Sequence, residues 1–255
     1  VGDLLKALEQ SGSSENTIVI YIGDHGADLP RGKRTCYEGG VRIPMIIRWP
    51  KAKENQRRSE LVSTLDLFPT ICDIAKIKTP KSLVGQSLKE IIHGKDQAWR
   101  KVIITEYHVH SNHNPWPQRA IRNERYKLIF NPLAGEINPG YDFTMSKKFF
   151  VASASNLLDA STKEVRLAYK NYRKPPLFEL YDLKEDPYEF KNLAKDPEYS
   201  KELKQLNDLL LQWQKESEDP FFFSKPSRKL FNLIRDSGTK DRKRINYKSM
   251  MNIRH

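Results

Sequence analysis

The chain has 255 residues, 38% of them hydrophobic, and its 44 Lys and Arg against 32 Asp and Glu residues give a formal net charge of +12. This length and composition suit one large core or two modest ones and exclude a chain that is disordered throughout. No apolar stretch approaches the roughly 20 residues that span a bilayer, so no membrane span is expected. Residues 228–255 hold nine basic and two acidic residues, so much of the positive charge belongs to one tail. Because no nucleic-acid-binding motif accompanies this charge, the sequence predicts no nucleic-acid partner.

The first part of the chain alternates helical and strand patterns. Leu4, Leu5, Ala7 and Leu8 lie at helical spacing, and a polar linker then leads to a β-branched run over residues 17–22. This order of helix, loop and buried strand is typical of a parallel α/β sheet, in which ligands bind at the carboxyl ends of the strands. A second apolar run, "RIPMIIRWP", and a helical pattern over "LVSTLDLFPTICDIAKI" continue the α/β organisation to about residue 95.

The pattern changes after residue 100. Strands are predicted at 101–107, 126–131 and 177–183, with helices around 155–170 and over 197–216. Strands separated by loops and closed by an amphipathic helix indicate a small α+β subdomain.

One loop, "IGDHGADLPRGKRTCYEGGVRIP" at residues 22–44, carries most of the candidate chemistry. Asp24 and His25 follow the predicted strand in a glycine-flanked turn, where both side chains can reach one ion. An Asp oxygen suits Ca²⁺ or Mg²⁺ whereas His suits softer metals, so the pair alone fits either a metal site or a hydrogen-bonded turn. Lys33, later in the loop, is either a surface lysine or a point charge for a tetrahedral anion.

A second group of candidate residues lies in "EYHVHSNHNPWPQR". Its members are Glu106, His108, His110, His113, Trp116 and Arg119. Three interpretations are open: a metal site, substrate contact through Glu106, His108 or Arg119, and a solvent-exposed loop. Arg119 can bind a sulfate or carboxylate bidentately, and Trp116 can either stack on a sugar ring or pack in the core.

The order of these segments resembles the carboxy-terminal half of the type I sulfatase family. The matching segments are "NTIVIYIGDHG", "GK", "TCYEGGVRIPMIIRWP", "VSTLDLFPTICDIAKI" and "FELYDLKEDPYEFKNLAKDPEYSKELKQLNDLLLQWQKESEDP", within residues 2–220. The spacing from Asp24 to Lys33 and the segments "PQRAIRNERYKLIFN" and "WQKESEDP" are similar to the sulfamidases, which remove N-sulfate from glucosamine in heparan sulfate. Lys33 departs from this pattern, because sulfamidases commonly carry Arg there and many O-sulfatases carry Lys.

The resemblance implies an α/β fold like that of alkaline phosphatase, with a mostly parallel sheet and a smaller α+β antiparallel subdomain. Residues 1–95 would form the carboxy-terminal part of the catalytic domain, residues 96–227 the subdomain, and residues 228–255 the basic tail. No internal repeat or low-complexity segment modifies this division.

The resemblance also implies site roles. Asp24 and His25 would be ligands of one Ca²⁺ ion, and Lys33 would be a catalytic contact to the sulfate. Type I sulfatases act through a formylglycine made from a C/S-x-P-x-R motif. Since Cys36 and Cys72 fit no such motif, the formylglycine and the remaining ligands are expected upstream, in a missing amino-terminal half.

The expected function is hydrolysis of a sulfate ester or sulfamate of a sulfated carbohydrate, namely N-sulfoglucosamine of heparan-type glycans. An O-sulfatase of another glycan and a phosphate-ester hydrolase of the same superfamily are the alternatives. The family implies a periplasmic, extracellular or lysosomal compartment, and the first residues look like an amphipathic helix instead of a signal segment.

Overall fold

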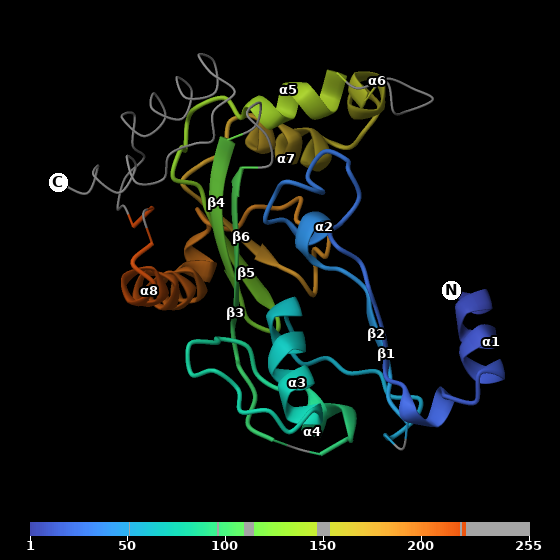
Figure 1. Cartoon of the computed structure of the whole chain (residues 1–255). Helices are drawn as coiled ribbons and strands as arrows, with labels where there is room; N and C mark the ends of the chain where they lie inside the picture. Colours follow the sequence, from blue (N-terminus) through green and yellow to red (C-terminus); the bar gives the residue numbers. More distant parts are fainter. Residues whose placement is uncertain (51, 96, 110–114, 147–153, 220, 223–255) are drawn as a thin grey trace, which may run out of the picture. The chain divides into compact units, whose positions relative to one another are not determined.

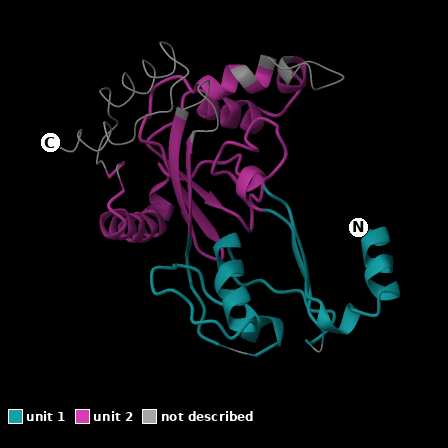
Figure 2. Ribbon diagram, in the orientation of Figure 1, with its two compact units in different colours: residues 1–24, 43–103 teal, residues 25–42, 104–255 magenta. Residues whose placement is uncertain are grey.

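The computed structural model describes residues 1–222 except 51, 96, 110–114, 147–153 and 220 (Figure 1). The chain forms two compact units: residues 1–24 with 43–103, and residues 25–42 with 104–255 (Figure 2). The predicted domain boundary at residue 95 stays a prediction, but the structure adds that loop 25–42 belongs to the second unit. The predicted basic tail and two of the candidate histidines, His110 and His113, lie outside the described residues.

The first unit contains short helices and one antiparallel strand pair. Its elements are α1 (Gly2–Gln10), η1 (Ser14–Asn16), β1 (Val19–Ile22), β2 (Met45–Arg48), η2 (Thr64–Asp66), α3 (Leu67–Ile74) and α4 (Lys89–Ile92). The sequence predicted a buried strand in a parallel sheet, whereas β1 pairs antiparallel with β2 and its Tyr21 and Ile22 are exposed. A parallel strand pair needs a crossover connection that packs on its own sheet. The segment between β1 and β2 belongs mostly to the second unit, and β2 returns in the opposite direction.

Asp66 fixes the start of the predicted helix over "LVSTLDLFPTICDIAKI". Its fully buried carboxylate accepts hydrogen bonds from the N–H groups of Ser63 at 2.7 Å and Gln86 at 2.8 Å. Arg100 donates to both of its oxygens, from Nη1 at 2.9 Å and from Nη2 at 2.5 Å. Pro69 is tolerated because it lies in the first turn of α3, where its missing N–H has no helical partner.

The second unit is built on a four-stranded sheet in the order β3-β4-β5-β6. Its strands are β3 (Ile103–Val109), β4 (Pro115–Arg122), β5 (Tyr126–Phe130) and β6 (Phe178–Asp182); β5 is antiparallel to both β4 and β6. Its helices are α2 (Glu38–Val41), α5 (Pro139–Ser146), α6 (Ala154–Asp159), α7 (Lys163–Arg173), η3 (Pro197–Tyr199) and α8 (Ser200–Glu216).

The two faces of this sheet bury different segments, because successive strand residues point to opposite sides. On one face, Ala120, Ile129 and Tyr181 pack with Cys36 and Tyr37 of loop 25–42. The other face packs against α8, which contacts β4 and β5 and lies along the sheet in Figure 1. Loop 25–42 and α8 therefore cover opposite faces of one sheet.

Most predicted elements are confirmed. They are the helix from residue 2, the strands of β1, β2, β3, β5 and β6, and the helices α3, α6, α7 and α8. The strand β4, the helix α5 and the short helices α2 and α4 were not predicted. In the described residues, no helix is both long and apolar enough to cross a bilayer.

Candidate functional site

Asp24 and His25 lie directly after β1, as predicted. Both are exposed, and the boundary between the two units falls between them. His25 Nδ1 lies 2.8 Å from the carbonyl oxygen of Gly26. Because a carbonyl only accepts, Nδ1 carries the hydrogen of this bond, and in the neutral imidazole Nε2 then has the lone pair that a metal ligand needs.

Glycines close loop 25–42 on itself. The Gly26 N–H donates to the Gly40 carbonyl at 2.9 Å, and a Cβ on Gly26 would lie 1.8 Å from the Gly39 oxygen. A Cβ on Gly40 would likewise lie 2.5 Å from the oxygen of Gly32. These approaches permit only glycine, so the glycines let the two ends of the loop come together.

Lys33 lies in a tight turn of the same loop. Its N–H donates to the Ala27 carbonyl at 2.8 Å, and its side chain is partly exposed. Within the described part of the chain, its ammonium has no hydrogen-bond or ion-pair partner. Arg34, which follows it, donates to both carboxylate oxygens of Asp28 across the turn, with Nη1 3.3 Å from Oδ2. Asp28 is therefore part of the structure of the turn.

The donor set for a metal ion is incomplete within the described residues. They contain no group of three or more His, Cys, Asp or Glu side chains that could hold an ion. Asp24 offers carboxylate oxygens of the kind that Ca²⁺ prefers, and calcium takes 6–8 oxygen ligands. These two residues fit a calcium site only as part of a larger ligand set.

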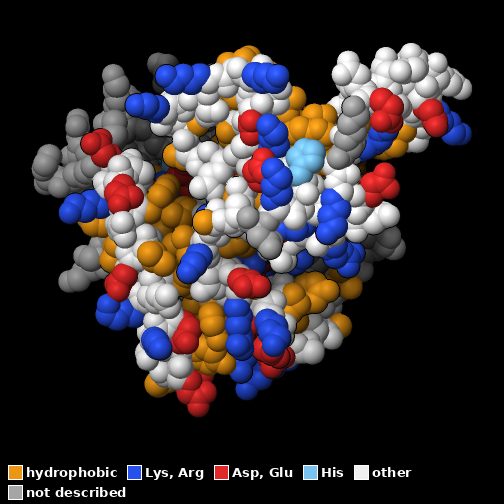
Figure 3. Space-filling view, turned by 90° about the horizontal axis from the view of Figure 1, so that it is seen from below, with side chains coloured by type: hydrophobic (Ala, Val, Ile, Leu, Met, Phe, Trp, Pro, Cys, Tyr) orange, Lys and Arg blue, Asp and Glu red, His pale blue; other side chains and the backbone are white. Residues whose placement is uncertain are grey.

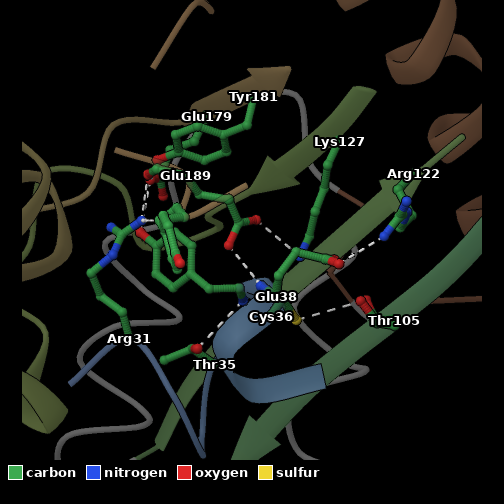
Figure 4. A network of polar contacts seen from close by, with 12 residues as sticks. Arg31, Thr35, Cys36, Glu38, Thr105, Arg122, Lys127, Glu179, Tyr181 and Glu189 are labelled. Atoms are coloured by element: carbon green, nitrogen blue, oxygen red, sulfur yellow. Dashed lines mark hydrogen bonds and ion pairs between the residues drawn. The ribbon is translucent and has the colours of Figure 1, made fainter. Parts of the chain in front are cut away.

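A buried polar network holds the base of loop 25–42 on the sheet (Figure 4). Lys127 Nζ lies 3.0 Å from Glu38 Oε1 and 3.0 Å from Glu189 Oε1, and Glu38 also accepts from Arg122 Nη1 at 2.7 Å. Arg31 donates to the Glu189 carbonyl. Burial raises the pKa of the Glu189 carboxyl, although the charge of Lys127 opposes that shift.

A second chain of hydrogen bonds joins the loop to three strands. Gln118 Oε1 accepts from the Cys36 N–H at 3.1 Å, and Gln118 Nε2 donates to Asn131 Oδ1 at 2.8 Å. Asn131 Nδ2 donates to Glu179 at 2.8 Å, and Glu179 also accepts from the Tyr37 hydroxyl at 2.7 Å. The chain of bonds thus begins and ends on neighbouring loop residues.

The two cysteines are structural, in agreement with the sequence analysis. Cys36 is fully buried, and this burial raises the pKa of its thiol to about 11. Cys72 is buried in α3. Since a cysteine nucleophile reacts as an exposed thiolate, neither residue suits that role.

Glu106, His108 and Arg119 are brought together on the sheet face that packs against α8. His108 Nε2 lies 3.0 Å from Glu106 Oε2, and both side chains are partly exposed. Arg119 Nη2 lies 3.5 Å from the same Glu106 oxygen, but its side chain is fully buried and forms a bidentate pair with Asp219. The substrate roles of Glu106 and His108 stay predictions, since these side chains lie on the face opposite loop 25–42, and the Arg119 guanidinium is buried.

Of the two roles expected for Trp116, the structure supports packing in the core and not stacking on a sugar ring, since the residue is 2% exposed. The network residues around Lys127 were not predicted from the sequence. The available signal was a set of polar residues at alternate positions of an otherwise apolar strand pair: Gln118, Arg122 and Lys127. Alternation of this kind normally predicts solvent exposure, and only the covering loop makes these positions buried.

Lys and Arg side chains on the face shown in Figure 3 lie beside acidic ones in several places. Arginines in the second unit are also paired with acidic side chains, as in Arg122 with Glu38 and Arg125 with Asp182.

A strand-end acid and imidazole, followed by a lysine in a glycine-closed loop, lie within the segment that the comparisons match. Residues 23–145 match the family described as N-sulphoglucosamine sulphohydrolase, C-terminal. The chain is 32% identical over 218 residues to an ulvan-active sulfatase of Formosa agariphila, covering 84% of this chain and 35% of that protein. It is 30% identical over 241 residues to human N-sulphoglucosamine sulphohydrolase, covering 87% and 46%. The chain corresponds to the carboxy-terminal portion of a sulfatase-family protein.

Solved structures confirm the fold class. A 2-O GAG sulfatase superposes with a TM-score of 0.63 at 28% identity, covering 85% of this chain and 40% of that chain. A protein solved with its substrate D-glucosamine-2-N,6-O-disulfate gives a TM-score of 0.58 at 27% identity, covering 89% and 39%. A phosphonate monoester hydrolase from Silicibacter pomeroyi, at 19% identity and a TM-score of 0.59, shares the fold alone. The fold is that of the alkaline-phosphatase-like sulfatases.

Proposed function

We propose that this chain is the carboxy-terminal part of a sulfatase that hydrolyses N-sulfoglucosamine residues of heparan-type glycans. The supporting observation is the match of residues 23–145 to the N-sulphoglucosamine sulphohydrolase family, which includes the loop of Asp24, His25 and Lys33. O-sulfatases also occur among the relatives, including an N-acetylglucosamine-6-O-sulfatase of Bacteroides thetaiotaomicron at 31% identity. Since Lys33 departs from the sulfamidase pattern, the bond that is cleaved is the point to test.

In this proposal the loop supplies charge to a sulfuryl group. Lys33 places an ammonium beside the sulfate oxygens, where it stabilises negative charge that spreads as the sulfur–nitrogen or sulfur–oxygen bond breaks. Asp24 and His25 are two ligands of a Ca²⁺ ion, which when bound would polarise the same sulfate. The formylglycine nucleophile belongs to the segment expected upstream of this chain.

Glu106 and His108, which lie on the sheet face opposite loop 25–42, are proposed contacts to parts of the glycan away from the sulfuryl group. A carboxylate accepts hydrogen bonds from sugar hydroxyl or amino groups, and the imidazole bonded to it is oriented for a second contact. Arg119 holds the Glu106 carboxylate from the buried side and acts as a positioning residue. Direct contact between Arg119 and the substrate is not part of the proposal, because the Arg119 side chain is 0% exposed.

The test uses the complete protein. Sulfate release is followed in parallel from N-sulfated, 6-O-sulfated and 2-O-sulfated glucosamine-containing disaccharides, and phosphate release is followed from an aryl phosphate. Preference for the N-sulfated sugar by several orders of magnitude is expected, since a site built for one set of polar groups rejects analogues that lack them. Preference for an O-sulfated sugar would show that the protein is an O-sulfatase and not a sulfamidase. Preference for the phosphate would contradict the sulfatase proposal itself.

The chain spans 35–46% of the length of the curated relatives described above. We therefore propose that these 255 residues alone release no sulfate, because the nucleophile and further metal ligands lie elsewhere in the complete protein. Detectable sulfate release by this polypeptide, purified free of other sulfatases, would contradict this part. The family likeness further suggests a periplasmic, extracellular or lysosomal location.

A further inference from the structure

Lys127 is a buried cation with no direct access to a substrate. It lies on β5, is 1% exposed, and its ammonium contacts two carboxylates, those of Glu38 and Glu189, at 3.0 Å each. Both carboxylates are themselves buried, and the Glu38 N–H donates to Glu189 Oε2 at 2.6 Å. Without the ammonium, two buried negative groups would face each other across the base of loop 25–42.

The two residues that carry these carboxylates contact the loop on opposite sides of Lys33. Glu38 begins α2, and the residues that follow it include Gly40, whose carbonyl binds the Gly26 N–H beside His25. The main chain of Glu189 accepts from Arg31, two residues before Lys33, and the Arg31 guanidinium lies 3.8 Å from the centre of the Tyr37 ring. The contacts among Lys127, Glu38 and Glu189 therefore hold the loop on both sides of Lys33, the candidate sulfate contact.

We propose that Lys127 is a positioning residue that sets the conformation of loop 25–42, and through it the place of Lys33, by bridging Glu38 and Glu189. Its effect on the reaction rests on the proposed function, whereas its effect on the loop does not. The physical basis is that an interior charge between two carboxylates has one favourable position, and small displacements of a catalytic group cost large factors in rate.

The test substitutes Lys127→Met in the complete protein, which keeps the length of the side chain and removes its charge. The expected loss in kcat/KM is about 100-fold. In a Lys33→Ala background the same change should cost less than about 3-fold, because two residues that act through one another are not additive. If Lys127 acted only on global stability, Lys127→Met would change kcat/KM by the same factor in the wild type and in the Lys33→Ala background, measured at temperatures below unfolding.

Hydrogen–deuterium exchange of the loop gives a reading independent of activity. The Gly26 and Lys33 amides, bonded to the Gly40 and Ala27 carbonyls, should exchange at least 10-fold faster in Lys127→Met. The control is Asp182→Asn, which weakens another ion pair of the same sheet, between the buried Asp182 and the exposed Arg125. That variant should leave exchange of the loop unchanged.

If Lys127→Met does not fold, Glu189→Gln provides the second variant, since it keeps the size of the side chain and removes one of the two charges. It should accelerate exchange of the loop amides by a smaller factor in the same direction. Loop exchange equal to that of the wild type in whichever variant folds would overturn the inference. A wild type without sulfatase activity but with faster loop exchange in the variants would contradict only the proposed function.

Discussion

The Arg119 guanidinium is locked onto Asp219, with Nε 3.0 Å from Oδ2 and Nη2 2.8 Å from Oδ1. Asp219 is held in turn by Gln214, whose Nε2 donates to it at 2.8 Å, and by the N–H of Phe221 at 3.2 Å. The Phe221 ring lies 4.7 Å from the guanidinium. This cluster joins β4 to the segment that follows α8 and covers one face of the sheet.

Arg119→Met should therefore lower the stability of the protein. Removing the cation leaves Asp219 buried without its charge partner, which costs about 3–5 kcal/mol and lowers the melting temperature by roughly 10 °C. Thermal unfolding followed by circular dichroism measures the effect. The double variant with Asp219→Asn should recover part of the loss. An unchanged melting temperature with a higher KM for oligosaccharides would instead support direct substrate contact.

Asp66→Asn should destabilise the first unit. Its carboxylate is fully buried and binds Arg100 and two main-chain N–H groups. Neutralising it leaves these donors and the partly buried guanidinium poorly matched, at a cost of about 3–5 kcal/mol. The matched control is Asp73→Asn in the adjoining helix α3. Asp73 pairs with Lys89 at 3.1 Å, but both side chains are more than a third exposed, and the expected cost is below about 1 kcal/mol. Equal urea midpoints for the two variants would count against this assignment.

The local patterns of the sequence predicted most elements because their causes are local. The helical spacing of apolar residues in α3 and α8 is contained within each segment. β4 was missed for a complementary reason. Its sequence "PWPQRAIR" contains two prolines and three polar residues, and its burial depends on partners such as Glu38 and Asp219, which lie 84 and 100 residues away in the chain. No short window of sequence contains that information.

The candidate site also contains residues that a short stretch of sequence predicts and residues that it does not. The loop of Asp24, His25 and Lys33 was identified because its glycines and charged residues lie within one short stretch. The network of Lys127 and Glu189 that supports this loop was not identified, since its members come from β5 and from the segment after β6. A buried lysine in a strand is indistinguishable from an exposed one until the covering element is known.

Glu106 should make the stability of the protein pH-dependent in the acid range. The hydrogen bond from His108 lowers the pKa of its carboxyl below the ordinary value of 4.5. The ionised form therefore stabilises the fold above about pH 4.5, and this contribution is lost as the pH falls through the lowered pKa. The difference in melting temperature between the wild type and Glu106→Gln should be largest near neutral pH and should shrink below about pH 4. The same comparison in a His108→Phe background should show little pH dependence; an unchanged dependence there would assign the effect to another group.

Asp24→Asn should abolish stabilisation of the complete protein by calcium. A ligand that binds only the folded state raises its stability by RT ln(1 + [L]/Kd), which is about 2.7 kcal/mol when the ion is at 100 times its Kd. Replacing one carboxylate ligand by an amide removes a negative charge from the ligand set around the ion and weakens binding. The rise in melting temperature on adding Ca²⁺ should therefore disappear together with sulfate release.

Asp28 is not a suitable control for Asp24→Asn, because it is bonded to Arg34 within the loop. Asp208→Asn serves instead, since Asp208 forms an exposed pair with Lys204 on α8 and its loss should change neither reading. A calcium-dependent shift of the same size in Asp24→Asn and in the wild type would show that Asp24 does not bind the ion.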